Sequence, residues 1–147
     1  MTYLLDTDAC IALINGRPEA VRRRFARVSA GDDVVATSSV VLFELWHGVA
    51  KSQRPKANAE RIATFLSGPL EVLDFTPEDA EHSGRVRAAL EGLGKPIGAY
   101  DLLIAGQALR HKATLVTANS SEFARVRGLR LQDWTTLARR GTDLRSR

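Results

Sequence analysis

The sequence predicts one α/β domain: a parallel central sheet flanked by helices on both faces, in three layers α/β/α. Short apolar runs alternate along the chain with longer segments in which apolar residues recur every three or four positions. The first pattern is typical of buried strands and the second of amphipathic helices. Strands that are separated by helices pair in parallel, and their sheet is covered on both faces. The length of 147 residues is sufficient for one hydrophobic core.

The first half of the chain predicts two strands and four helices. An apolar run that begins at Tyr3 stops at the polar residue Asp6, and a second run follows a turn at Gly31. Pro18 suits the first turn of a helix, and Ser38 or Ser39 can accept the free N–H groups at the start of another. The predicted order is strand 3–5, helix 8–15, helix 20–28, strand 34–37, a helix from 39 to about 52, and helix 56–67.

The second half predicts three strands and further helices. Thr76 and Pro77 are a strong helix start, because threonine caps the N–H groups and proline fits the first position. The segment Gly94-Lys95-Pro96 ends that helix. The predicted order is strand 71–75, a helix from 76 to about 93, a loop at 97–100, helix 101–111, strand 114–117, a turn with a short helix at 119–126, and an edge strand at 129–131.

Composition excludes several classes of protein. The chain is 44% hydrophobic and 26% charged, which is typical of a globular domain rather than a disordered one. No window approaches eighteen consecutive apolar residues, and the N-terminus lacks the basic start of a secretory signal. The single cysteine, Cys10, excludes an internal disulfide, and its apolar neighbours favour a core position over a nucleophile. We therefore expect a cytoplasmic protein with no membrane association.

Oxygen-bearing side chains are found where a parallel sheet places its functional site. Asp6 ends the first strand, Asp101 begins a helix, Asn119 and Glu122 follow a later strand, and Glu44 lies within the helix after the second strand. Sites of such sheets lie beyond the carboxyl ends of the strands. Converging carboxylates repel one another unless protons or cations intervene, and oxygen ligands favour Mg²⁺ or Mn²⁺. The pattern therefore predicts an acidic metal site.

Each of these acids also has a structural interpretation. Asp6 and Asp101 suit the N-terminal turns of helices, where carboxylates accept free N–H groups. Glu44 could be a solvated helix residue, although its neighbours are apolar, and Glu122 could pair with Arg125 on the surface. Spacing alone leaves a metal site and helix capping both open.

Five segments carry a more specific signal, in chain order. They are Leu4–Asp8, Ser38-Ser39 with Phe43–Gly48, Ile97–Gly106, Leu115–Phe123 and Arg125–Trp134. Together they resemble the PIN-domain ribonucleases, and in particular the VapC-type toxins of bacterial toxin–antitoxin pairs. The resemblance implies a single PIN-like domain over residues 1–134. It leaves 135–147 as a basic C-terminal tail, for which disorder is one interpretation. Residues 139–147 alone hold four arginines and one aspartate, so most of the formal charge of +4 belongs to this tail.

The resemblance implies a metal-dependent endoribonuclease that hydrolyses RNA with a metal-activated water. Asp6 and Asp101 match the acids that hold the first Mg²⁺, for which Mn²⁺ can substitute, and Glu44 matches the third acid. Glu122 and Asn119 match positions for an outer contact or a second metal.

Two threonines and three basic residues complete the expected site. Thr7 and Thr117 stand beside the acids as residues that orient substrate or water. Arg17, Arg22 and Lys51 are candidates for RNA phosphates, with a solvated basic face as the alternative for each.

The resemblance also implies a homodimer and a cognate VapB-type antitoxin, which forms a hetero-oligomer with the toxin and occupies the groove near the acids. Phe43 and Trp46 are expected partner contacts.

Two other functions are compatible with parts of the sequence. A phosphatase similar to the haloacid dehalogenases would use Asp6 and Asp8, but Cys10 stands where its motif needs threonine. A catalytically inactive binding module of the same fold would use the acids only as helix caps. Metal-dependent RNA cleavage distinguishes the ribonuclease from both.

Overall fold

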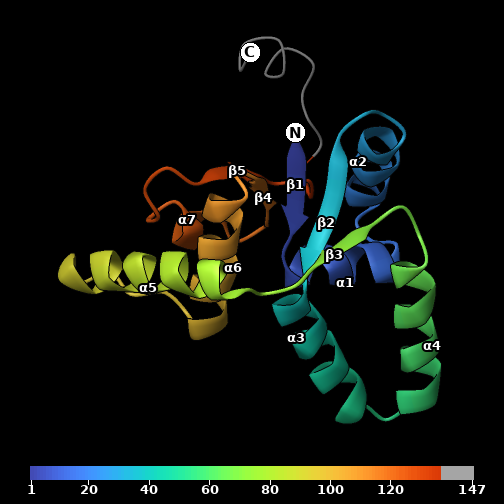
Figure 1. Ribbon diagram of the computed structural model, residues 1–147. Helices are drawn as coiled ribbons and strands as arrows, with labels where there is room; N and C mark the ends of the chain where they lie inside the picture. Colours follow the sequence, from blue (N-terminus) through green and yellow to red (C-terminus); the bar gives the residue numbers. More distant parts are fainter. Residues whose placement is uncertain (137–147) are drawn as a thin grey trace.

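The computed structural model describes residues 1–136, in which five parallel strands form one sheet in the order β3-β2-β1-β4-β5 (Figure 1). The strands are β1 (Thr2–Leu5), β2 (Val34–Ser38), β3 (Glu71–Leu73), β4 (Thr114–Val116) and β5 (Arg130–Gln132). The helices are α1 (Thr7–Asn15), α2 (Glu19–Ser29), α3 (Ser39–Ala50), α4 (Pro55–Leu66), α5 (Pro77–Gly92), α6 (Ala99–Arg110) and α7 (Ser120–Phe123).

The sheet lies between two groups of helices. Figure 1 shows α1, α2 and α4 to one side of it and α5, α6 and α7 to the other, while α3 runs away from the carboxyl ends of the strands. Every strand pairing is parallel, with Leu4 of the central strand opposite both Ala36 and Leu115. The predicted three-layer α/β/α fold is confirmed. Across the described residues, every helix is too short or too polar to span a membrane.

The predicted elements are present, and two of their boundaries shift for identifiable reasons. Strand β3 ends at Leu73 rather than at residue 75, because Phe75 N–H donates to Ser39 Oγ (3.0 Å) instead of to a neighbouring strand. Helix α6 begins at Ala99 rather than at Asp101. Gly98 precedes its first turn and its carbonyl accepts from Leu102 N–H at 3.0 Å, so the expected loop at 97–100 is half helix.

The C-terminal end of the described chain is fastened to the sheet by Trp134. Its side chain is only 1% exposed, and its Nε1–H donates to Gln132 Oε1 at 2.9 Å. The Tyr3 ring lies 5.6 Å from it, and the Arg24 guanidinium lies over it at 6.0 Å. These contacts support a domain that extends to residue 134. Of the predicted tail, residues 137–147 lie outside the described residues.

Helices α5 and α6 cross at very close range. A Cβ added to Gly106 would lie 2.5 Å from the backbone nitrogen of Ser83 and closer still to its hydroxyl. The Ser83 hydroxyl also donates to the Leu103 carbonyl at 3.2 Å. Only glycine allows this approach, and the crossing sets the position of α6, whose first turn carries Asp101.

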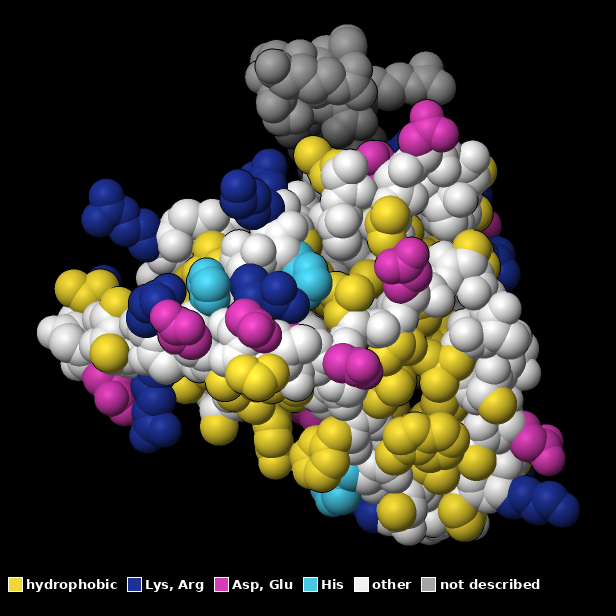
Figure 2. Space-filling model, viewed as in Figure 1, with side chains coloured by type: hydrophobic (Ala, Val, Ile, Leu, Met, Phe, Trp, Pro, Cys, Tyr) yellow, Lys and Arg dark blue, Asp and Glu magenta, His cyan; other side chains and the backbone are white. Residues whose placement is uncertain are grey.

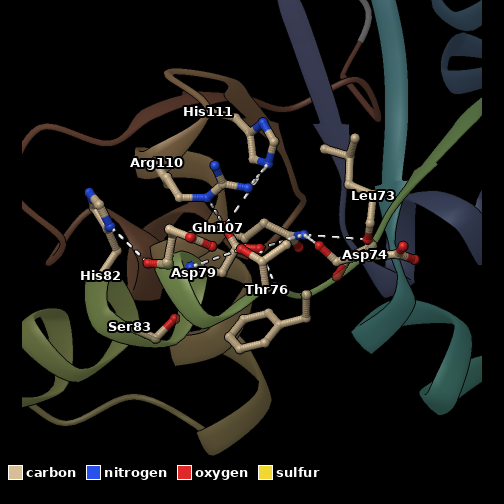
Figure 3. A network of polar contacts seen from close by, with 12 residues as sticks. Leu73, Asp74, Thr76, Asp79, His82, Ser83, Gln107, Arg110 and His111 are labelled. Atoms are coloured by element: carbon tan, nitrogen blue, oxygen red, sulfur yellow. Dashed lines mark hydrogen bonds and ion pairs between the residues drawn. The ribbon is translucent and has the colours of Figure 1, made fainter.

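A buried carboxylate ties the same helix pair to the end of β3 (Figure 3). Asp79 is 0% exposed and forms a capping box with Thr76 at the start of α5. Arg110 pairs with its Oδ1, while Gln107 Nε2 donates to its Oδ2 (3.3 Å) and to the Asp74 carbonyl (3.2 Å). Burial by itself raises the pKa of Asp79, but the hydrogen bonds from Arg110 and the Thr76 backbone bring it below its ordinary value. The carboxylate is therefore ionised and paired at neutral pH.

Candidate active site

Asp6 stands at the junction of β1 and α1 and serves two roles. Its Oδ1 accepts Ala9 N–H at 2.8 Å, so it caps α1, as its structural interpretation predicts. The side chain is also 5% exposed and lies beside Thr117, Asp8 and Glu44. Burial raises the pKa of Asp6 to about 6, although hydrogen bonds from Thr117 and Ala9 oppose the shift. A capping role and a place in the acidic cluster therefore coexist in one residue.

Asp101 reaches the cluster from the opposite face of the sheet, on the first turn of α6. Burial, followed in order of effect by the charges of Glu122, Asp6 and Glu44, raises its pKa to about 6. Electrostatic coupling of this kind requires the carboxylates to be close neighbours. Thus the structure brings together acids from four separate segments of the chain, at the carboxyl ends of the strands.

Glu122 faces Asp101 rather than the surface. Its Oε2 accepts Asn119 Nδ2 (2.8 Å) and its Oε1 accepts Gly98 N–H (3.0 Å). These two hydrogen bonds lower the pKa of Glu122 while that of Asp101 is raised, so a proton shared by the pair belongs mainly to Asp101. The Arg125 guanidinium donates to the Pro96 carbonyl at 3.0 Å and forms no ion pair with Glu122 among the described residues, although its charge contributes to lowering the pKa of Glu122.

Both predicted threonines hold other members of the cluster. Thr7 Oγ1 donates to Glu44 Oε1 at 2.7 Å and so joins α1 to α3. Thr117 hydrogen-bonds Asp6, and its hydroxyl accepts Asn119 N–H at 2.9 Å. Each threonine therefore restrains an acidic or amide group before any ligand binds.

One of the three predicted basic residues shares a cavity with a residue of the acidic cluster. Arg17 lines a cavity whose wall includes Thr117. Arg22 is exposed on α2, with its guanidinium 3.7 Å from Glu19. Lys51 follows α3, seven residues beyond Glu44, which corresponds to about 10 Å along the helix. The structure therefore favours Arg17 for contact with a ligand at the acids.

Gly98 lies in the acidic cluster, although the sequence did not lead us to predict it as a site residue. A Cβ there would lie 3.5 Å from Asp101 Oδ2 and 4.0 Å from Glu122 Oε1. Its N–H also donates to Glu122. A glycine directly before the acidic first turn of a helix is the sequence signal that could have identified it.

The donor set fits a divalent cation with few protein ligands. Within residues 1–136 no three Asp, Glu, His or Cys side chains form a complete metal cage. The nearby donors are nevertheless all oxygens, and two of them, Asp6 and Asp101, have raised pKa values that a cation would relieve. Mg²⁺ commonly binds one or two carboxylates and keeps several waters. Asp6 and Asp101 could therefore hold such a cation, and hydrogen bonds restrain Glu44 and Glu122 nearby.

An apolar surface begins beside the acids. Phe43 and Tyr100, the residues before Glu44 and Asp101, are 54% and 46% exposed, and their rings lie 5.5 Å apart. Trp46 is 42% exposed one turn along α3. Figure 2 shows apolar side chains gathered over this lower part of the molecule.

A cavity of about 180 Å³ lies between α1, α3 and α4, with Glu44 among its lining residues. Its other lining residues are mostly apolar and include Ile14, Leu45 and Ile62.

Cys10 is fully buried, and burial raises the pKa of its thiol to about 12. The thiol therefore belongs to the core, as predicted, and is unsuited to nucleophilic chemistry at neutral pH.

Comparison with known proteins gives a consistent result. The PIN domain family matches residues 3–129. A tRNA(fMet)-specific endonuclease VapC of Shigella flexneri is 41% identical, over 92% of this chain and 99% of the relative. Ribonuclease VapC2 of Rickettsia felis is 40% identical, over 91% of this chain and 98% of the relative.

Solved structures agree. The crystal structure of VapBC2 from Rickettsia felis, bound to a DNA fragment from its promoter, matches with a TM-score of 0.86 and 39% identity, covering 91% of this chain and 99% of that one. DNA-bound VapBC from Salmonella typhimurium matches with a TM-score of 0.83 and 40% identity, covering 91% and 98%.

Proposed function

Since the chain belongs to the PIN-domain family, among its VapC-type ribonucleases, we propose that it is a Mg²⁺-dependent endoribonuclease and the toxin of a toxin–antitoxin pair. The observation that carries this proposal is the convergence of Asp6, Glu44, Asp101 and Glu122 at the carboxyl edge of the sheet, with the pKa of two of them raised to about 6. If the acids served only as helix caps, each would need to lie only at the start of its own helix. Their convergence from opposite faces of the sheet would then have no explanation.

The acids of the cluster have different roles in the proposed hydrolysis. Asp6 and Asp101 hold Mg²⁺, or Mn²⁺ as a substitute, which when bound supplies positive charge to a phosphate oxygen and makes a water molecule more acidic. Glu44 is kept in place by Thr7, and Glu122 by Asn119 and Gly98. Restraint of this kind before substrate binds lowers the cost of reorganisation during the reaction. Water forms the new bond to phosphorus and the bond from phosphorus to the 3′ oxygen breaks, so the products carry a 5′-phosphate and a 3′-hydroxyl.

The partner is a VapB-type antitoxin. The structures that match are toxin–antitoxin complexes, and the apolar cavity between α1, α3 and α4 ends at Glu44. An antitoxin segment with apolar side chains in this cavity would bring a basic residue to the acids and exclude RNA. We further propose that the toxin acts in the cytoplasm as a homodimer.

Cleavage assays test the proposal directly. We expect the purified chain to cleave single-stranded RNA in Mg²⁺ or Mn²⁺ and to stop in EDTA. Transfer RNA for initiator methionine is the first substrate to assay, because two similar relatives are named for it. Asp101→Asn should lower the rate by about a hundredfold or more, since loss of a restraining contact alone costs metal sites about 10–100-fold.

The matched control is Asp32→Asn, which removes the same charge from an exposed turn and should leave the rate unchanged. Full activity of Asp101→Asn, or products that end in a cyclic phosphate, would contradict the assigned chemistry. An inert protein that still binds an antitoxin would favour the binding module. Sequencing of RNA ends after induced expression would identify the target.

A further inference from the structure

A cavity of about 240 Å³ opens on the side of α1 away from α3, between α1, the start of α2 and the C-terminal segment. Its walls are apolar and include Ala12, Val21 and Trp134, all 9% exposed or less. The polar side chains among its lining residues are Asp8, Asn15, Arg17, Thr117, Asp133 and Thr135. The acidic site and the antitoxin cavity make no use of this space, although Ile11 and Asn15 border both cavities.

The cavity neighbours the acidic site through two residues, Thr117 and Asp8. Thr117 lines it and also hydrogen-bonds Asp6. Asp8 lines it too, and its charge raises the pKa of Asp6. A nucleotide next to a phosphate that is bound through a cation at Asp6 and Asp101 would therefore have this cavity beside it.

Size and polarity limit what the cavity can bind. Pockets for drug-sized ligands measure about 300–1,000 Å³, so this smaller volume suits one planar ring system. Apolar walls fit the faces of a nucleobase, and recognition in RNA-binding proteins commonly takes an unstacked base into such a site. Carboxylates at the rim accept hydrogen bonds and cannot donate them. Asp133 Oδ1 already accepts two donors from Thr135, its N–H (2.8 Å) and its hydroxyl, which leaves Oδ2 as the oxygen that can accept from a ligand.

From this geometry we propose that the cavity is a base pocket that takes an unpaired guanine beside the scissile phosphate, with Asp133 on its Watson–Crick edge and Arg17 on its phosphate. Guanine presents two adjacent N–H donors on that edge, both of which can point at the one oxygen Oδ2, whereas uracil presents one donor between two carbonyls. This inference rests on the proposed ribonuclease function and adds the base that the enzyme selects.

The test measures binding without cleavage. Full-length Asp101→Asn protein is titrated in EDTA against eight-nucleotide oligouridylates that carry a single G, A or C at each position in turn, with fluorescence anisotropy as the readout. At one position we expect guanine to bind about tenfold more tightly than uracil, because hydrogen bonds from a base to a charged acceptor are worth roughly that factor. Asp133→Asn should abolish this preference while affinity for plain oligouridylate stays within about twofold.

Two further variants separate base recognition from charge. Arg17→Gln should weaken all the RNAs by a similar factor and leave the guanine preference intact, because a phosphate contact carries no base information. Asp32→Asn and Arg27→Gln remove the same charges from exposed positions outside the cavity and should change neither preference nor affinity. Ala118→Leu, which adds bulk at an exposed position of the cavity wall, should abolish the preference without touching Asp133.

Several outcomes would overturn the proposal. Equal affinity for all bases at every position would do so, as would a guanine preference that survives both Asp133→Asn and Ala118→Leu. If Asp133→Asn weakens antitoxin capture about tenfold and leaves RNA binding unchanged, the cavity serves the protein partner. These outcomes can be distinguished from failure of the proposed ribonuclease function. In that case the unmodified chain would show no Mg²⁺-dependent cleavage of RNA.

Discussion

Asp6 is held in a position that disfavours its own charge. The same burial that makes it a rigid cap for α1 raises its pKa to about 6. A residue that served only as a cap would be better placed at the surface, where its carboxylate could remain solvated. Burial of the Asp6 carboxylate makes the metal-free protein less stable at neutral pH. The same burial leaves a carboxylate that readily releases its proton when a cation binds.

This conflict predicts the pH dependence of stability in EDTA. The unfolded pKa is near 3.8 and the folded pKa about 6, so the folded state binds the proton more tightly and stability falls as the pH rises through this interval. Asp6→Asn keeps a capping oxygen without the charge. We expect it to stabilise the metal-free protein by about 3 kcal/mol at pH 8 and to have little effect below pH 4. Urea unfolding at both pH values measures this difference.

Asp32→Asn is the control, because Asp32 is exposed in the turn before β2. A gain of the same size from Asp32→Asn would attribute the effect to net charge. An Asp6→Asn effect independent of pH would show that burial of the carboxylate is not its cause.

The sequence predicts which acids meet but not how each is held. Asp6, Asp101 and Glu122 could be predicted because each adjoins a strand end or a helix start, and the geometry of a parallel sheet brings these together. The bond from Thr7 to Glu44 joins residues 37 positions apart and depends on how α1 packs against α3. The role of Gly98 likewise depends on the side-chain directions of Asp101 and Glu122, which no local pattern specifies.

At the scale of elements, the crossing of α5 and α6 determines where Asp101 stands. Because a Cβ at Gly106 would meet the Ser83 backbone at 2.5–2.6 Å, Gly106→Ala must separate the helices. We expect a loss of about 3 kcal/mol in unfolding free energy, together with weaker RNA cleavage as α6 shifts. Chemical denaturation and the cleavage rate are the two measurements.

A matched variant lies next to the contact. Gly84 follows Ser83 on α5, is exposed, and has open space where a Cβ would stand. Gly84→Ala should therefore stabilise the protein by about 0.5–1 kcal/mol, as expected for a helix interior. If both alanines had the same effect, helix propensity rather than the crossing would explain Gly106.

The buried Asp79 gives the opposite pH dependence from Asp6. Its pKa is lowered in the folded state, so its stabilisation is complete above the unfolded pKa near 3.8 and is lost as the pH falls below that value. Asp79→Asn should cost about 3 kcal/mol at pH 7, since it leaves Arg110 without its partner. The deficit should narrow in strong acid, and urea unfolding at pH 7 and pH 2.5 measures it. A deficit equal at both pH values would exclude the ion pair as its origin.

The order and type of the elements could be predicted because apolar periodicity and caps such as Thr76-Pro77 are local signals. The ends of β3 and α6 could not. Ser39 withdraws Phe75 N–H from the sheet, and Gly98 starts α6 two residues early. Both are decided by groups whose positions only the folded chain establishes.

On the scale of the whole molecule, four acidic segments from both faces of the sheet form one centre of negative charge. A divalent cation there should stabilise the entire domain, because it binds the folded state in preference to the unfolded one. At about a hundred times its dissociation constant Mg²⁺ should add about 2.7 kcal/mol. Thermal unfolding with and without Mg²⁺ measures this gain.

EDTA should reverse the Mg²⁺ gain, Asp32→Asn should preserve it, and the double variant Asp6→Asn, Asp101→Asn should abolish it. An undiminished gain in the double variant would place the cation elsewhere.

The strand order also has a consequence for the synthesis of the protein. The central strand β1 comes first along the chain, but its neighbour β4 and the edge strand β5 come last, and Trp134 closes the core after them. The proposed site combines Asp6, which follows β1, with Glu122, which follows β4. A ribosome that is still translating therefore carries a polypeptide without a complete catalytic centre. We therefore expect ribonuclease activity only after almost the whole domain has left the ribosome. The surface that binds the antitoxin is folded at the same stage.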